Sequence, residues 1–123
     1  MRGFPGDADG YAGSLSCTRE VTAVTAACMM MRRDEYIECG GLLEYYATHY
    51  QDLDLCLRFF SSGKRILYTP RAVLIHHESV SRGQCYDSLD RALIIDTWGD
   101  LIKRGDPYYN PNFTLARCDY TAL

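Results

Sequence analysis

Two carboxylates stand close together in the middle of the chain, at Asp52 and Asp54. A glycine-rich turn precedes them at residues 40–41, and a loop containing His76 and Arg82 follows them. Carboxylate and imidazole groups move protons at reacting centres, and guanidinium groups hold phosphates. We interpret this combination as part of a catalytic site.

The residues after Asp52 have the spacing of a helix. Apolar side chains recur at i, i+3, i+4 and i+7 and form one stripe, made of Leu53, Cys56, Leu57 and Phe60. Asp54 and Arg58 are four residues apart, which favours an ion pair on another side of the helix. Ser61, Ser62 and Gly63 are expected to end it.

The flanking segments predict a mixture of strands and helices. We expect strands at 20–31, 65–68 and 72–75, where β-branched or aliphatic residues form short apolar runs. We expect a short helix at 32–38 that stops at Gly40, and a longer one at about 88–103. Its stripe would contain Ile94, Trp98 and Leu101, flanked by Ile95 and Ile102. The chain is therefore of the α/β class.

Composition and charge exclude several classes of protein. A length of 123 residues predicts one domain, and 47% hydrophobic with 24% charged residues is ordinary for a globular protein. A net charge of −3 argues against nucleic-acid binding. The longest apolar run, at 23–31, is too short to cross a bilayer.

The six cysteines do not predict a disulfide framework or a zinc site. They are unevenly spaced without a C-x-x-C pair, and no signal peptide precedes them. Cys28 and Cys56 lie within apolar runs, where a thiol behaves as a small hydrophobe. A reducing cytoplasm fits this pattern. We therefore expect the protein in the cytoplasm, either free or bound at the inner face of the membrane. Asp7 and Asp9 form a D-x-D without a preceding strand, so we interpret them as a solvated turn.

A set of motifs in fixed order resembles the C-terminal half of glycosyltransferase family 2, which has the GT-A fold. The likeness covers about residues 10–120 and is nearest to rhamnosyltransferase-like bacterial members. The motifs stand at residues 24–28 (VTAAC), 32–33 (RR), 40–42 (GGL), 51–58 (QDLDLCLR), 68–70 (YTP), 76–83 (HHESVSRG) and 106–111 (DPYYNP).

The resemblance implies a role for each matching residue. Asp52 corresponds to the general base of an inverting transfer, His76 to a residue near the metal, and Ser81 and Arg82 to contacts of the donor diphosphate. The residues on the acceptor side would be Gly41, Leu42, Glu44, Gln51 and Asp54. A divalent cation, Mn or Mg, is expected in the complete enzyme. Leu43 stands where the family has an aspartate, which is a departure on the acceptor side.

The resemblance also implies a division of the chain. Residues 1–16 would be a flexible arm or loop, 17–105 the acceptor-side half of a partial GT-A domain, and 106–123 an irregular tail. The donor-binding half with its D-x-D has no counterpart here. The chain would then be inactive alone and would need that half or self-association. The substrates would be a nucleotide-diphosphate sugar and a glycan acceptor.

Less specific interpretations remain open for the same residues. Asp52 could be only an acidic residue at the N-terminus of a helix, and Asp54 could have no role beyond its ion pair with Arg58. His76 and His77 would point to opposite faces of a strand, so at most one of them faces a site. Tyr108, Tyr109 and Asn110 could line an acceptor groove or only pack the tail. The alternative functions are an autonomous, non-catalytic module that binds glycans or self-assembles, and a small metal hydrolase using His76, His77 and Asp52.

Overall fold

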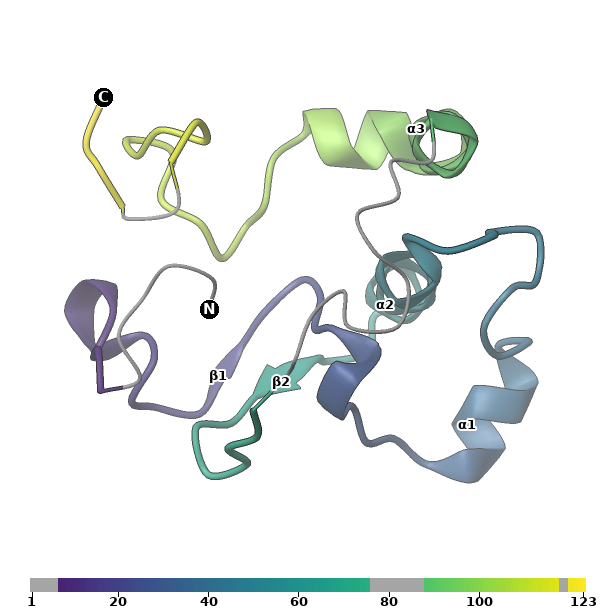
Figure 1. The fold of residues 1–123 in the computed structure, drawn as a ribbon, viewed down its shortest axis with the longest axis horizontal. Helices are drawn as coiled ribbons and strands as arrows, with labels where there is room; N and C mark the ends of the chain where they lie inside the picture. The colour runs from purple at the N-terminus through teal and green to yellow at the C-terminus, as the bar shows by residue number, and fades with distance from the viewer. Residues whose placement is uncertain (1–6, 76–87, 118–119) are drawn as a thin grey trace.

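The computed structural model describes residues 7–75, 88–117 and 120–123. Within these ranges the chain forms three α-helices, two short strands and two 3₁₀ turns (Figure 1). In order they are η1 (Tyr11–Gly13), β1 (Arg19–Glu20), η2 (Ala26–Cys28), α1 (Arg33–Glu38), α2 (Gln51–Ser61), β2 (Leu67–Tyr68) and α3 (Ser88–Lys103). The sequence predictions for His76, Ser81 and Arg82 lie outside the described residues.

The structure confirms the predicted helices. α2 and α3 occupy the expected segments, and α1 begins one residue later than predicted. Gly40, with φ 83°, ends α1 because its left-handed conformation lets Gly40 N–H bond Ile37 O at 3.0 Å. Gly63, with φ 77°, ends α2 in the same way, and its N–H donates to Phe60 O at 3.0 Å.

The long strand predicted at 20–31 is wrong. Only Arg19 and Glu20 form β1, which pairs antiparallel with β2 so that Arg19 lies opposite Tyr68. The apolar run instead turns into η2, where the Thr25 side chain accepts a hydrogen bond from Ala27 N–H at 3.3 Å. A capping threonine followed by two alanines favours a turn over a strand, which the β-branched residues before it do not outweigh.

Two further strand predictions also differ from the structure. The segment predicted at 65–68 contributes only its last two residues to β2. The segment at 72–75 is not a strand, and its apolar side chains lie in solvent, with Val73, Leu74 and Ile75 exposed by 84%, 67% and 83%. An apolar run becomes a buried strand only where a neighbouring strand and a covering layer exist, and the described residues provide neither here.

The hydrophobic core lies between α2, α3 and the loop that leads into α2. Tyr46, Leu57 and Ile94 form its centre. The partly buried side chains packed against it are Leu43, Tyr50, Leu53, Trp98 and Leu101. The predicted stripe of α3 is therefore confirmed, whereas its expected flanks, Ile95 and Ile102, are about half exposed. Of the two cysteines predicted to be buried, Cys56 is buried and Cys28 is exposed.

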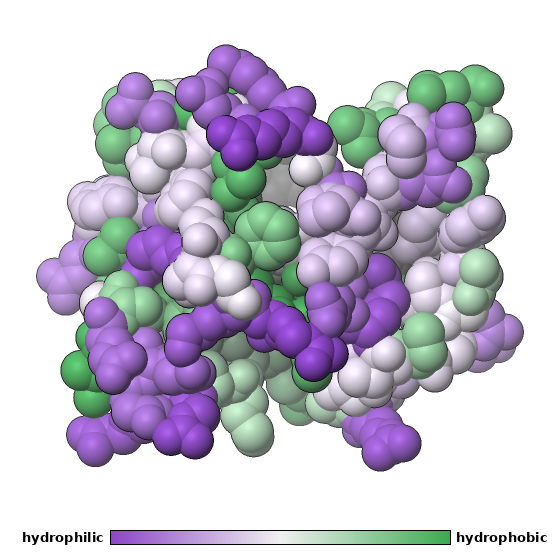
Figure 2. All heavy atoms as spheres, turned by 180° about the vertical axis from the view of Figure 1, so that it is seen from behind, coloured by the Kyte–Doolittle hydropathy of each residue, from purple (hydrophilic) through white to green (hydrophobic). Residues whose placement is uncertain are grey.

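The three α-helices lie together on one side of the molecule, and η1 and the C-terminal segment lie on the other (Figure 1). There, the ring of Tyr11 packs edge-on against that of Phe113, with 4.6 Å between the ring centroids. The ring of Tyr109 stacks on that of Tyr120, with 6.0 Å between the centroids. Residues 106–112 form turns and no helix or strand, as the two prolines predicted, and Phe113 forms a bridge with Ala122. On the reverse face, hydrophilic side chains surround smaller apolar areas (Figure 2).

Candidate functional site

Asp52 lies in the first turn of α2, where it joins two elements that are distant in sequence. Its Oδ2 accepts a hydrogen bond from Ala26 N–H of η2 at 3.0 Å, and its Oδ1 accepts one from Leu53 N–H at 2.9 Å. The side chain is half-buried. A carboxylate has about four lone-pair positions, so two donors leave capacity for a further proton donor from solvent or a ligand.

Asp54 lies in a different environment, although it is only two residues away. It is 1% exposed, and its Oδ2 accepts a hydrogen bond from Arg58 Nε at 2.9 Å. Its Oδ1 accepts one from Trp98 Nε1 of α3 at 2.8 Å. The predicted ion pair with Arg58 is confirmed. The Asp54 side chain is not accessible to a glycan acceptor in this structure. Its predicted contact with the glycan therefore stays a prediction, and it would require α2 and α3 to separate.

Arg58 connects the buried Asp54 to the glycine-rich turn. Its Nη1 donates to Cys39 O, and its Nη2 donates to Gly41 O at 2.6 Å. Gly41 has φ 64°, and a Cβ at this position would lie 2.9 Å from the Tyr36 ring. Tyr36 Oη in turn accepts the N–H of Leu42 at 3.2 Å. The turn predicted to face an acceptor is thus fixed by a side chain from α2 and by a close backbone approach that only glycine allows.

Leu42, Glu44 and Gln51 surround this turn with different exposures. Leu42 is 40% exposed and Glu44 is exposed, so both are open to a ligand. Gln51 is half-buried, and its Nε2 donates to Tyr46 O at 2.8 Å. Burial, and secondarily the charge of Asp54, raises the pKa of Tyr46 to about 12, which keeps this core phenol neutral.

Asp90 is an important residue that sequence reasoning missed. It lies in the first turn of α3, is 1% exposed, and accepts three backbone N–H bonds from the loop before α2. The donors are Ala47 at 2.9 Å, Thr48 at 2.8 Å and His49 at 2.8 Å. Burial by itself raises the pKa of Asp90, but these three donors outweigh it and hold the pKa below its usual value. An acid in a first helical turn normally indicates only the helix dipole, so no local signal predicts this contact.

The described residues do not by themselves fit a metal site. No group of three or more His, Cys, Asp or Glu side chains within 7–75, 88–117 and 120–123 could hold a metal ion. Asp9 of the D-x-D accepts a hydrogen bond from Ser16 Oγ at 2.5 Å and is exposed. His76, for which a metal-proximal place is predicted, lies outside the described residues.

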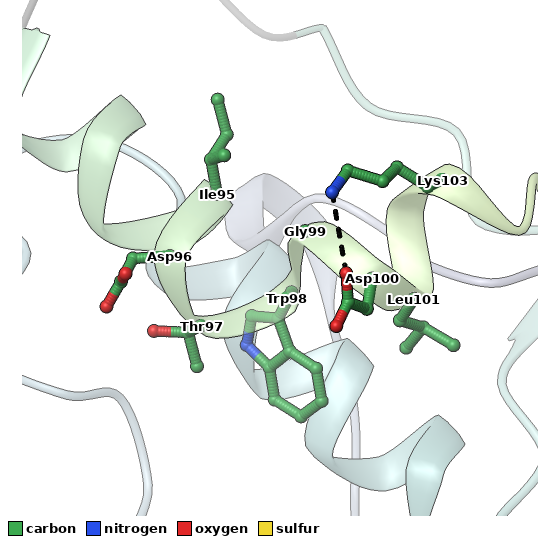
Figure 3. Close-up of a pocket in the computed structure, with 8 residues that line it drawn as sticks. All are labelled: Ile95, Asp96, Thr97, Trp98, Gly99, Asp100, Leu101 and Lys103. Carbon is green, nitrogen blue, oxygen red and sulfur yellow. Dashed lines mark hydrogen bonds and ion pairs between the residues drawn. The ribbon is translucent and has the colours of Figure 1, made fainter.

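A shallow hollow of about 350 Å³ follows the second half of α3 and contains none of the predicted site residues (Figure 3). In that view Trp98 points toward α2, whereas Ile95 points to the opposite side of the helix.

Tyr109 Oη donates to Thr114 O at 3.0 Å, so this tyrosine packs the tail. None of the helices in the described part of the chain has the length and apolar character needed to cross a bilayer.

Several curated proteins are similar to this chain. Uncharacterized protein y4gI of Sinorhizobium fredii is 38% identical over 95% of the chain and 14% of its own length. O-antigen biosynthesis protein RfbC of Myxococcus xanthus is 37% identical over 87% of the chain and 8% of its own length. N-acetylglucosaminyl-diphospho-decaprenol L-rhamnosyltransferase of Mycobacterium tuberculosis is 32% identical over 54% of the chain and 22% of its own length.

The chain spans less than a quarter of the length of each of these relatives. No protein-family model matches it, and no solved structure matches it significantly. The names of two relatives, an O-antigen biosynthesis protein and a rhamnosyltransferase, nevertheless agree with the resemblance to glycosyltransferases that rests on the motifs at residues 24–111. The similarities therefore support the coarser part of the sequence prediction, a relationship to glycosyltransferase-like proteins.

Proposed function

We propose that this chain forms the acceptor-side part of an inverting family 2 glycosyltransferase with a GT-A fold. In this proposal the complete enzyme moves a sugar from a nucleotide-diphosphate sugar to a glycan acceptor. The named relatives support glycosyl transfer in general. The observation that carries the assignment of roles is the contrast between Asp52, half-buried and held by two N–H donors, and Asp54, fully buried and paired.

The reaction gives Asp52 a defined task. An acceptor hydroxyl oxygen forms a bond to the anomeric carbon, while the bond from that carbon to the diphosphate breaks and its electron pair leaves with the diphosphate. The hydroxyl proton passes to a carboxylate oxygen of Asp52, which acts as general base. The N-terminal end of α2 favours negative charge at this position.

The glycine-rich turn would lie beside the acceptor. Arg58 fixes this turn through Cys39 O and Gly41 O, so its position relative to α2 does not depend on a flexible loop. Leu42 and Glu44 are exposed next to it and are proposed to contact the acceptor. Fixed geometry of this kind matters because a misplacement of about 1 Å at a reacting group can cost about 100-fold in rate.

The donor side of the proposal rests on residues outside the described ranges. Ser81 and Arg82 are proposed to contact the diphosphate, and His76 to lie near a Mn or Mg ion. Because the described residues alone do not fit a metal, no step is assigned to that ion. The exposed run Val73, Leu74 and Ile75 supports a further proposal, that a donor-binding half or a second copy covers these side chains.

The test uses the protein as it is naturally made. Nucleotide-diphosphate sugars serve as donors and polysaccharides as acceptors. Wild type is expected to form product with an inverted anomeric centre, read by NMR of the new linkage. Asp52→Asn should lower kcat by about 10²–10⁴, the usual contribution of a positioned base. Asp100→Asn is the matched control, because Asp100 is a 92% exposed acid of α3. A retained anomeric configuration, or full activity of Asp52→Asn, would contradict the proposal.

A second candidate function is a non-catalytic module that binds glycans or assembles with itself. The exposed apolar side chains at 73–75 favour it, because such a surface promotes association. Analytical ultracentrifugation and glycan binding without turnover would support this candidate. Hydrolysis of a donor sugar by the chain in the presence of manganese would exclude it.

A further inference from the structure

The loop that leads into α2 is held from a distance by α3. Three successive backbone N–H groups, those of Ala47, Thr48 and His49, point to the carboxylate of Asp90. Asp90 is more than forty residues away in sequence and is 1% exposed. Only Tyr50 and Gln51 separate this loop from Asp52.

We propose that Asp90 is a positioning residue that sets the place of Asp52 through residues 47–50. This inference rests on the proposed function, in which Asp52 is the base. Asp90 does not touch a reacting atom in this account. It fixes the path of the chain immediately before the helical turn that carries the base.

Tyr50 transmits the constraint. It lies in the left-handed region with φ 68°, which is uncommon for an aromatic residue and persists where the surroundings hold it. Its carbonyl oxygen accepts the N–H of Asp54 at 2.8 Å, the first hydrogen bond of α2. A change in the path of residues 47–49 therefore alters both the strained residue and the start of the helix.

A carboxylate is suited to this contact because it offers acceptors only. Oδ2 of Asp90 takes the N–H groups of Thr48 and His49, and Oδ1 takes that of Ala47. An asparagine would present one oxygen and one NH₂ group, and the NH₂ group would oppose at least one of the three N–H donors. Asp90→Asn thus disturbs the loop while it keeps the size of the side chain.

The experiment compares Asp90→Asn with Asp96→Asn in the protein as it is naturally made. Asp96 is an exposed acid of the same helix, so its variant controls for lost charge. Asp90→Asn is expected to lower kcat by about 10- to 100-fold with the donor KM unchanged, because the base moves and the donor site does not. Rates are measured well below the unfolding temperature of each variant, and Asp90→Glu, which keeps a carboxylate, should recover part of kcat.

Backbone amide NMR gives a reading that does not depend on activity. In Asp90→Asn the amide protons of Ala47, Thr48 and His49 should shift upfield, since each loses or weakens a charge-assisted bond. The shifts should extend to Leu53 N–H, which donates to Asp52 and reports the orientation of that carboxylate. Shifts that stop at His49, or an unchanged kcat in Asp90→Asn, would overturn the positioning role.

The two failures can be told apart. If wild type shows no sugar transfer, the proposed function fails, and the amide shifts alone then decide whether Asp90 controls the conformation at Asp52. If wild type is active and Asp52→Asn is inactive, but Asp90→Asn keeps wild-type kcat, only the positioning role fails.

Discussion

Two regions of the molecule differ in how they are held together. The helical region comprises residues 33–61 and 88–103, and the sheet region comprises residues 7–31, 64–75 and 106–117. Every buried residue in the described part of the chain belongs to the helical region. The sheet region has none, and its apolar residues Met30, Val73 and Ile75 are 97%, 84% and 83% exposed.

The polar contacts show the same contrast. In the helical region, Asp54 and Asp90 are buried and each accepts several hydrogen bonds. In the sheet region, Glu20 accepts from Arg65 Nε at 2.5 Å and from Tyr108 Oη at 2.9 Å, both at the surface. The geometry around Asp52 is therefore determined mainly by the helical region, whereas the sheet region contributes one N–H donor, from Ala26.

The largest effect on stability is expected for Asp54→Asn. Loss of the charge leaves Arg58 without its buried partner, and a broken buried pair costs about 3–5 kcal/mol of unfolding free energy. Urea unfolding followed by circular dichroism measures this cost. Asp96→Asn on the exposed side of α3 should unfold as wild type does. Equal stability of the two variants would show that the buried pair does not stabilise the helical region.

A smaller loss is expected for Gly41→Ala. The residue has φ 64°, and a Cβ would lie 2.9 Å from the Tyr36 ring, so strain of about 1–3 kcal/mol follows. Gly40→Ala is the matched control. Gly40 also has a positive φ, 83°, but a Cβ there meets nothing within 4 Å. Thermal unfolding should rank Gly41→Ala below Gly40→Ala, and the reverse order would show that the close approach to Tyr36 does not matter.

Acid should weaken the helical region through Asp90. Because its pKa is lowered in the folded state, its contribution to stability is complete above the ordinary value of 3.8. The contribution is lost as the pH falls through the lower, folded-state pKa. Urea midpoints measured below pH 3.8 should fall more steeply for wild type than for Asp90→Asn. Parallel curves would indicate that the three N–H bonds do not hold the carboxylate.

The smallest effect is expected in the sheet region. Glu20→Gln removes an exposed ion pair with Arg65, and surface pairs contribute little because water and salt screen them. The unfolding midpoint should match that of wild type within error. A large loss would show that β1 and the tail form a second cooperative core.

The sequence was informative where local spacing determines structure. Apolar residues at helical intervals predicted α2 and α3, and the i, i+4 spacing predicted the ion pair between Asp54 and Arg58. The burial of Asp54 was not predictable, because it depends on Trp98 from α3. Asp90 was missed for the same reason, since its donors are 41–43 residues away.

The strand predictions failed for a different physical reason. Residues 20–31 and 72–75 have the composition of strands, but a strand also needs a neighbour that pairs with it and a layer that covers it. Among the described residues, β1 and β2 pair over two residues each, and the capped turn at Thr25 redirects the first run. Composition therefore predicted which segments could pair, while the presence of partners decided which did.

The most direct test of the account compares Asp52→Asn with Asp54→Asn for both stability and transfer in the naturally made protein. Asp52→Asn is expected to lower the unfolding midpoint far less than Asp54→Asn does, because Asp52 is only half-buried, and to lose about 10²–10⁴ in kcat. Asp54→Asn should lose stability. Its remaining folded fraction should turn over within a few-fold of wild type, because the Arg58 bonds to Cys39 O and Gly41 O do not need the charge of Asp54. A fully active Asp52→Asn, or a stable and inactive Asp54→Asn, would contradict the assignment of the base.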